Sequence, residues 1–166
     1  MTTSPTVNKI NTQTQSEPLK VCFVCTGNTC RSPMAMAVLN HLGKGRYIAT
    51  SAGIMADEGC PINEKAANSL QSVGILPTEA NPYDKHKATQ LNMGIMESCD
   101  KIVAVGAGHA MMIIQSFPLW ASKVTSFEHI ISDPFGKSQE AYDKCLADII
   151  SNVKETFALD GEIAGE

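Results

Sequence analysis

Residues 19–33 read LKVCFVCTGNTCRSP, a short apolar run that ends at a cysteine and is followed by a Gly-Asn pair. The apolar part, from Leu19 to Val24, favours a β-strand, and the Gly-Asn pair marks a tight loop directly after it. Ser32 followed by Pro33 is typical of a helix start, with serine as the N-cap and proline as the first helical residue. We therefore expect a strand, a loop and a helix in direct succession.

Strands and helices alternate along the rest of the chain. Apolar runs and turn residues predict strands at residues 47–51, 101–105 and 124–127, and helices at residues 63–73, 90–98 and 108–116. The clearest helix follows Ser138, because its apolar residues fall on one continuous helical face: Tyr142, Leu146, Ile149, Ile150, Val153 and Phe157. This order indicates an α/β fold of three layers, α/β/α, around a central, mostly four-stranded parallel sheet.

Length and composition limit the classes of function. The chain has 166 residues, 43% of them hydrophobic and 18% charged, and a net charge of −4, which is typical of one globular domain. The sequence has no cluster of Lys and Arg that could bind the backbone of a nucleic acid, so we expect no nucleic-acid partner. The apolar stretches are far shorter than the roughly 20 residues of a membrane-spanning helix, so we expect no membrane partner either.

The domain organisation follows from the same features. Residues 1–18 are polar and have no apolar core of the kind that a secretory signal needs, so we expect a disordered leader there. Residues 19–160 are expected to form the single domain, and residues 161–166 a short tail. Six cysteines without regular spacing suggest reduced thiols and a cytoplasmic location.

Cys25 and Arg31 bring together what an attack on a phosphoryl group needs. The N–H groups of the loop between them, with the N-terminus of the next helix, can converge on phosphate oxygens. Gly27 and Asn28 tolerate the unusual backbone dihedrals that this curvature requires. The guanidinium of Arg31 offers a planar fork for two of the oxygens, and the same positive field favours the thiolate of Cys25. Nucleophile and anion site would then be one element.

A proton donor is the remaining requirement. A thiolate that attacks phosphorus forms a phosphocysteine and releases the alcohol or amine of the substrate, which must be protonated to leave well. Asp133 is the best-placed carboxylate, because the proline after it rigidifies the turn. The same residue could then take a proton from the water that hydrolyses the intermediate. One acid would serve both steps.

This constellation resembles the low-molecular-weight protein tyrosine phosphatase family over nearly the whole chain after the leader. The family pattern occurs in order, as Cys-x5-Arg-Ser-Pro at residues 25–33, Ser-Ala-Gly at 51–53, His-Lys-Ala at 86–88 and Asp-Pro-Phe at 133–135. The resemblance implies the phosphotyrosine protein phosphatase I-like fold. It also implies a cysteine-dependent protein phosphatase that works through phosphocysteine, needs neither cofactor nor metal, acts on phosphorylated proteins, releases inorganic phosphate and is a monomer.

The resemblance assigns roles to the matching positions. Cys25 would be the nucleophile, Arg31 the phosphate clamp and Asp133 the general acid. The other substrate-binding positions would be Thr26, Gly27, Asn28, Thr29, Cys30, Ser32 and Phe135. In the family an Asn, two Ser and a His form a hydrogen-bonded network that holds the loop in shape, and the matching residues are Asn28, Ser32, Ser51 and His86. Ser32 would also stabilise the thiolate.

Thr29 bears on the substrate. The segments TGNTCRSPMA and DPFG are more similar to the bacterial protein arginine phosphatases than to the tyrosine-specific members. Tyrosine phosphatases usually have a bulkier aliphatic residue at the position of Thr29, which suits an aryl ring. Asp133 could pair with the guanidinium of phosphoarginine, whose P–N bond breaks easily once the nitrogen is protonated. We expect hydrolysis of phosphoarginine, phosphotyrosine or both, and favour phosphoarginine.

Other interpretations remain open at this point. Cys30 is either a packed thiol or a resolving partner that traps an oxidised Cys25 as a disulfide. A thioredoxin-linked arsenate reductase shares the fold and the anion loop, but it needs a pair of extra cysteines near the third strand, where this chain has only Cys99. A non-catalytic phosphoprotein-binding module is the second alternative. Zinc is disfavoured, because no second paired Cys/His cluster has ligand spacing.

Overall fold

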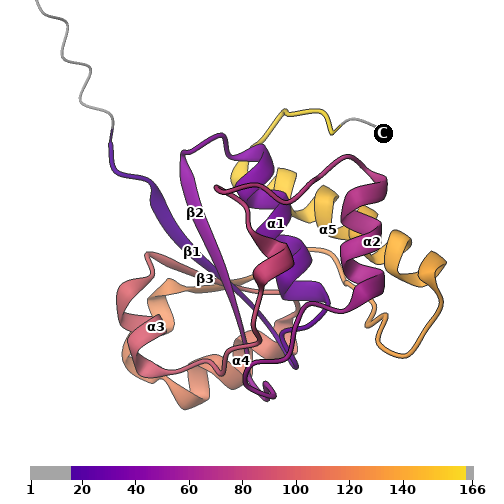
Figure 1. Ribbon diagram of the computed structural model, residues 1–166. Coiled ribbons are helices and arrows are strands. Elements are labelled where there is room, and N and C mark those ends of the chain that lie inside the picture. Colours follow the sequence, from indigo (N-terminus) through magenta and orange to yellow (C-terminus); the bar gives the residue numbers. More distant parts are fainter. Residues whose placement is uncertain (1–15, 164–166) are drawn as a thin grey trace, which may run out of the picture.

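The computed structural model describes residues 16–163, and Figure 1 shows the path of the chain through them. Residues 1–15 of the predicted leader and residues 164–166 of the predicted tail lie outside the described residues. Eleven elements follow one another in this range, and their order begins β1, α1, β2, α2. The strand–helix alternation predicted from the sequence is therefore confirmed.

The central strand β1 (Leu19–Cys25) is buried from Val21 onward, and its side chains alternate between the two faces of the sheet. Val21, Phe23 and Cys25 pack on one face, whereas Cys22 and Val24 pack on the other. A strand buried on both faces reads as a continuous apolar run, which is the pattern of its sequence. The alternation places the thiol of Cys25 on the Phe23 face.

The sheet has four parallel strands in the order β2-β1-β3-β4. The other three strands are β2 (Tyr47–Gly53), β3 (Lys101–Ala104) and β4 (Val124–Ser126). The chain moves from β1 to one side of the sheet and then returns to the other side for β3. Ligands of such sheets bind beyond the carboxyl ends of the strands, at the point where the strand order reverses. Cys25 ends β1 at this point.

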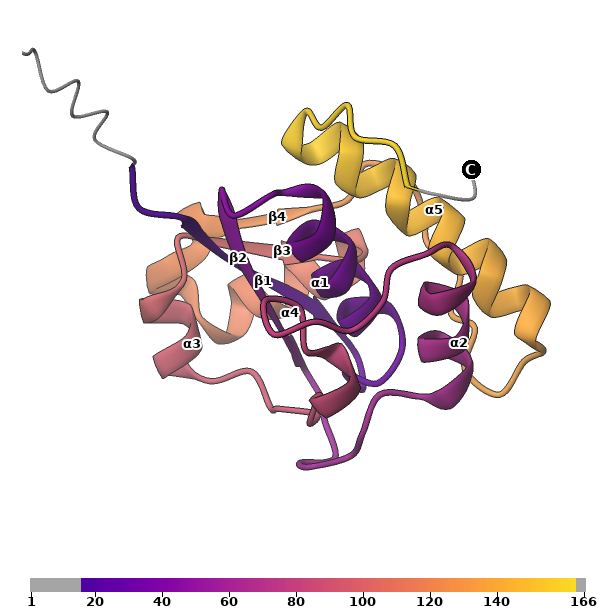
Figure 2. The same ribbon diagram turned by 45° about the horizontal axis from the view of Figure 1, so that its top comes forward.

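Helices cover both faces and complete the three layers (Figures 1 and 2). On the Phe23 face lie α1 (Arg31–Leu42), α2 (Glu64–Ser72) and α5 (Gln139–Phe157). The opposite face is covered by α3 (Met93–Ser98) and α4 (Ala107–Ser116). Two short 3-10 helices, at Tyr83–Lys85 and Pro118–Lys123, lie in the connections. The predicted three-layer α/β/α architecture is confirmed.

Helix boundaries differ from the sequence prediction where side chains cap the backbone. The helix predicted for residues 90–98 begins only at Met93, because the Asn92 side chain accepts the N–H of Ile95 and fixes the start there. Ser138 caps α5 as predicted, since its side chain accepts from the N–H of Ala141. Every helix within residues 16–163 is too short or too polar to cross a bilayer.

Candidate active site

The anion loop, residues 25–31, connects β1 to α1 at the carboxyl end of the sheet. Asn28 has a φ of 58°, so the left-handed backbone that the curvature requires lies at this residue. Gly53, at the end of β2, lets the loop approach closely, because a Cβ there would lie 2.5 Å from the carbonyl oxygen of Thr26. The Ser-Ala-Gly motif therefore ends in glycine for a steric reason.

The thiol of Cys25 lies at the bottom of the loop and is 3% exposed. Its Sγ is 2.9 Å from the Ser32 hydroxyl and 3.3 Å from the backbone nitrogen of Asn28, whose N–H donates to the sulfur. When the sulfur is a thiolate, the Ser32 hydroxyl is a donor as well, and charge-assisted hydrogen bonds of this kind stabilise the anion. The geometry therefore suits a thiolate at Cys25.

Ser32 does not cap the helix, which corrects the sequence prediction. Helix α1 begins at Arg31, two residues before the predicted first helical residue Pro33, and has no side-chain cap. The Ser32 hydroxyl is instead engaged with Cys25, with an amide hydrogen of Asn28 and with the carbonyl of Ala52. The first N–H groups of an uncapped helix carry partial positive charge and bind anions. The helix start therefore serves the anion loop.

Asn28 is fully buried and holds the loop in shape through the predicted network. Its side-chain amide donates to Ser32 Oγ and Ser51 Oγ, both at 2.9 Å, and its side-chain oxygen accepts the N–H of Thr89 at 2.9 Å. The backbone carbonyl lies 2.8 Å from Nε2 of His86, which is the donor in this bond. The structure thus brings together all four residues predicted to support the loop.

His86 reaches the loop from the connection that precedes α3. Burial lowers the pKa of His86, and the hydrogen bond to the Asn28 carbonyl opposes this effect. A neutral imidazole still has one N–H to donate to the carbonyl, so the bond does not require the charged form.

Arg31 and Asp133 face each other across the mouth of the site. The guanidinium Nη2 lies 3.3 Å from Oδ2 of Asp133, and the arginine side chain is 10% exposed whereas the aspartate side chain is 56% exposed. The other oxygen of Asp133 accepts the N–H of Phe135 at 3.1 Å, which closes a turn around Pro134. The carboxylate is therefore held over the loop but stays accessible to solvent.

These residues surround a cavity of about 230 Å³. Its lining consists of Cys25, Thr26, Gly27, Asn28, Thr29, Cys30, Arg31, Asp133 and Phe135. The predicted catalytic residues and all predicted substrate-binding residues except Ser32 thus share one cavity. Phe135 lies at its rim and is 69% exposed.

Cys30 is buried and lies 3.3 Å from the hydroxyl of Tyr142 on α5. Burial raises the pKa of Cys30, and the hydrogen bond from Tyr142 partly offsets the shift. A thiol that stays protonated is a weak nucleophile. The contact suits the packed-thiol interpretation of Cys30, and the disulfide with Cys25 stays the untested alternative.

Sequence reasoning missed two groups that contact the loop. Nε2 of His109, in the first turn of α4, lies 2.9 Å from the Thr26 hydroxyl, and the backbone N–H of Thr89 is bonded to Asn28. The Thr89 contact is made by a backbone N–H, which every residue except proline has, so the sequence gives no sign of it. For His109 a signal existed, because it follows closely after β3, whose carboxyl end meets that of β1.

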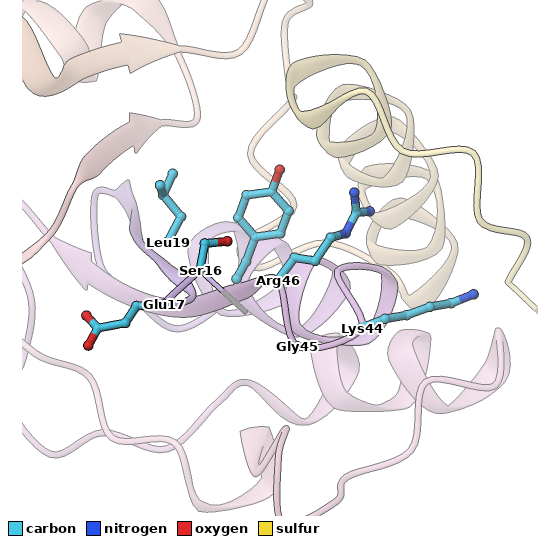
Figure 3. A pocket seen from close by; sticks show the side chains of 7 residues that line it. Ser16, Glu17, Leu19, Lys44, Gly45 and Arg46 are labelled. Atoms are coloured by element: carbon cyan, nitrogen blue, oxygen red, sulfur yellow. The ribbon is translucent and has the colours of Figure 1, made fainter. Parts of the chain in front are cut away.

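A larger hollow, of about 560 Å³, lies at the opposite end of β1 (Figure 3). Its lining consists of Ser16, Glu17, Leu19, Lys44, Gly45, Arg46 and Tyr47, and none of these residues is a cysteine. The charged ends of Lys44 and Arg46 point away from Glu17 (Figure 3). The predicted nucleophile and the loop of residues 25–31 line the smaller cavity, so cavity size alone does not identify the candidate active site.

Comparisons with known proteins agree with this geometry. Residues 20–162 match the family described as low molecular weight phosphotyrosine protein phosphatase. A protein-arginine-phosphatase of Geobacillus stearothermophilus is 35% identical over 132 residues, which cover 75% of this chain and 84% of the relative.

Two solved structures extend the comparison. A low molecular weight protein tyrosine phosphatase from T. tengcongensis superposes with a TM-score of 0.76 and 28% identity, covering 84% of this chain and 98% of that chain. A mutant of the YwlE arginine phosphatase with a phosphorylated active-site serine superposes with a TM-score of 0.74 and 26% identity, covering 83% and 93%. The chain therefore belongs to the low molecular weight phosphotyrosine protein phosphatase family.

Proposed function

We propose that this protein is a cysteine-dependent protein phosphatase that hydrolyses phosphorylated arginine side chains through a phosphocysteine intermediate. The observation that carries the proposal is the position of Cys25. Its sulfur receives hydrogen bonds at the bottom of a cavity whose mouth is spanned by Arg31 and Asp133. A nucleophile, an anion site and a proton donor thus converge on the space that a phosphoryl group would occupy.

In the first step the thiolate of Cys25 attacks phosphorus, an S–P bond forms and the bond to the substrate nitrogen breaks. Arg31 leaves its pairing with Asp133 and binds two phosphate oxygens, while the loop N–H groups bind the others. Asp133, in its protonated form, donates a proton to the departing nitrogen. The YwlE mutant with a phosphorylated active-site serine supports a phosphoenzyme in this family.

In the second step water attacks the phosphocysteine. The carboxylate of Asp133 takes a proton from the water, the S–P bond breaks, and inorganic phosphate leaves while the thiolate of Cys25 is restored. Asn28, Ser32, Ser51 and His86 act as positioning residues, because their hydrogen bonds fix the loop before substrate binds. Preorganised donors cost no reorganisation in the transition state.

Thr29 and Asp133 support phosphoarginine over phosphotyrosine. Thr29 lines the cavity as a small polar wall, where an aryl ring would gain more from an aliphatic side chain. Asp133 pairs with the guanidinium of Arg31 and is 56% exposed at the mouth of the cavity, so its side chain is accessible to the guanidinium of a substrate. The arginine phosphatase relative from Geobacillus stearothermophilus points the same way.

The alternatives fit the site less well. Cys99 packs with Cys22 in the core on the opposite face of the sheet from Cys25, so it is poorly placed for the thiol relay of an arsenate reductase. A purely binding module would not need Asp133 above the nucleophile. We further propose a cytoplasmic monomer, and the six free thiols of the chain fit a reducing compartment.

Replacement of Thr29 by Ile tests the substrate assignment. We expect the wild-type protein to hydrolyse a phosphoarginine peptide faster than a phosphotyrosine peptide of the same sequence. The ratio of the two kcat/KM values should fall about tenfold or more in Thr29→Ile, since one extra methylene group in a pocket changes discrimination by roughly 10–200-fold. Thr125→Ile, at an exposed position of β4, is the control and should keep the wild-type ratio. An unchanged ratio in Thr29→Ile would refute the role of this pocket wall.

A further inference from the structure

His109 contacts the active site from an element that the mechanism does not otherwise use. It is the third residue of α4, and its Nε2 lies 2.9 Å from the hydroxyl oxygen of Thr26. Thr26 is the residue directly after the nucleophile, is exposed, and lines the cavity over Cys25. A side chain of the β3–α4 junction therefore bonds to a hydroxyl at the mouth of the site.

The charges around His109 favour a neutral ring. Burial lowers its pKa, the guanidinium of Arg31 lowers it further, and the carboxylate of Asp133 opposes both effects. Within residues 16–163, these two are the charged side chains that act on the ring, and both belong to the proposed catalytic machinery. At neutral pH the imidazole is therefore uncharged, and one of its two nitrogens accepts hydrogen bonds.

The protonation of His109 decides what Thr26 can offer to a substrate. A threonine hydroxyl has one hydrogen to donate and two lone pairs to accept. If Nε2 accepts that hydrogen, the Thr26 oxygen is left as an acceptor at the mouth of the cavity. If the ring is protonated, both nitrogens donate, so Nε2–H bonds to the oxygen and the Thr26 hydrogen is the group left over. A proton on His109 thus changes this hydroxyl from a group that only accepts hydrogen bonds in the cavity to one that also donates a hydrogen there.

We propose that His109 is a positioning residue that sets leaving-group specificity: its neutral ring, in the tautomer with hydrogen on Nδ1, accepts the Thr26 hydrogen and leaves both Thr26 lone pairs for the N–H groups of phosphoarginine. The inference rests on the proposed function and deepens it. A phosphotyrosine leaving group carries no N–H donor, so it gains nothing from this acceptor. Protonation of His109 occupies one of the two Thr26 lone pairs, turns the Thr26 hydrogen toward the cavity and adds a positive charge near the substrate guanidinium. Selectivity for phosphoarginine should therefore decrease in acid.

The experiment compares two proteins over a range of pH. The ratio of kcat/KM for a phosphoarginine peptide to kcat/KM for the matching phosphotyrosine peptide is measured from pH 5 to 8 in wild type and in His109→Gln. Glutamine keeps a hydrogen-bonding side chain but does not titrate. The ionisation of the substrates is common to both proteins, so the difference between the two profiles isolates His109. We expect the wild-type ratio to fall about tenfold more than the His109→Gln ratio toward pH 5, the size of one lost hydrogen bond.

Two further variants sharpen the test. Thr26→Val leaves the imidazole in place but removes the hydroxyl, so its ratio should be low throughout and follow the His109→Gln profile in shape. His129→Gln is the matched control, because His129 is exposed and pairs with Glu155 on α5, and it should reproduce the wild-type profile.

The results distinguish a failure of the role of His109 from a failure of the proposed substrate. Parallel profiles for wild type and His109→Gln, with phosphoarginine still preferred at pH 8, would overturn the role of His109 alone. A wild-type protein that does not prefer phosphoarginine at pH 8 would overturn the proposed substrate, and this inference with it.

Discussion

Asp133, the proposed general acid, is the residue whose contacts must change most if substrate binds as proposed. Its carboxylate is more than half exposed, and exposed ion pairs contribute only about 0–1 kcal/mol. The pairing with Arg31 therefore yields easily to a phosphate, which offers the guanidinium two oxygens at full negative charge. The hydrogen bond from the Phe135 N–H to the other carboxylate oxygen can persist and keep Asp133 over the site.

Replacement of Asp133 by Ala should therefore lower kcat most for substrates whose leaving group must be protonated to depart. For phenyl phosphate, whose leaving group is poor, we expect kcat to fall by about 10²–10⁴, the usual contribution of general acid catalysis. For p-nitrophenyl phosphate, whose leaving group departs without a proton, the loss should be far smaller. Steady-state kinetics on both esters measure the difference, with the exposed Asp84→Ala as control. Equal losses on the two esters would remove Asp133 from the role of acid.

Asn28 explains why the loop keeps its shape without a ligand. It is fully buried, has a left-handed backbone, and is engaged on its amide, its side-chain oxygen and its carbonyl. Buried polar groups are costly unless they are bonded, and a satisfied network of this kind fixes one conformation. The same residue supplies an N–H to the Cys25 sulfur. The shape of the loop and the position of the Cys25 thiol are therefore linked through one residue, by its side chain and its backbone.

Among the elements, α1 and α3 show how the two ends of a helix are treated differently. The start of α1 has no side-chain cap, so its N–H groups stay available for an anion. The end of α3 is closed by Lys123, whose ammonium donates to the carbonyls of Met96, Glu97 and Cys99, each at 2.9 Å. A cation at a helix C-terminus complements the helix dipole as well. The start of α1 thus stays available for an anion, whereas the end of α3 is stabilised by Lys123.

Replacement of Lys123 by Met should lower the free energy of unfolding by about 2 kcal/mol, within the range for hydrogen bonds to a charged group. Methionine keeps an apolar side chain of similar length, but the three carbonyls at the end of α3 lose the donor that Lys123 supplies. Urea unfolding measures the change. Lys101→Met is the control, since Lys101 is exposed and its ammonium has no partner within residues 16–163; its effect should stay below about 0.5 kcal/mol. A loss for Lys123→Met no larger than that of the control would show that the three bonds contribute nothing.

The sequence predicted elements well where a local pattern exists, and failed where distant residues decide. The apolar run of β1 and the helical stripe of α5 each follow from spacing, and both elements formed. Ser32 was predicted as an N-cap, but its hydroxyl is taken by Cys25 and Asn28, a competition that local sequence does not show. Cys25, Arg31 and Asp133 were found by motif, and the structure places them together. His109 was missed because no motif marks it: its contact with Thr26 spans 83 residues, and its position shortly after β3 was the one signal in the sequence.

At the scale of the whole molecule, the topology assembles the site from distant segments. The carboxyl end of β1 supplies Cys25, the proposed nucleophile. The connection before α3 supplies His86, the start of α4 supplies His109, and the loop before α5 supplies Asp133. Because β1 lies inside the sheet, with β2 and β3 as its neighbours, the junctions that follow these strands meet around its end. An anion bound there contacts several elements, so its binding should stabilise the fold as a unit.

Phosphate should therefore raise the unfolding temperature of the inactive variant Cys25→Ser, which keeps the anion loop but lacks the nucleophile. A ligand at 100 times its Kd stabilises the native state by about 2.7 kcal/mol, and each kcal/mol shifts Tm by roughly 2–4 °C at this chain length. We expect a rise of about 5–10 °C in phosphate relative to chloride at equal ionic strength. Arg31→Met, added to Cys25→Ser, should abolish the rise in the unfolding temperature. Arg46→Met, which removes a cation from the hollow at the opposite end of β1, should leave it intact. If Arg46→Met removes the effect and Arg31→Met does not, the anion binds in that hollow, and the assignment of the anion loop fails.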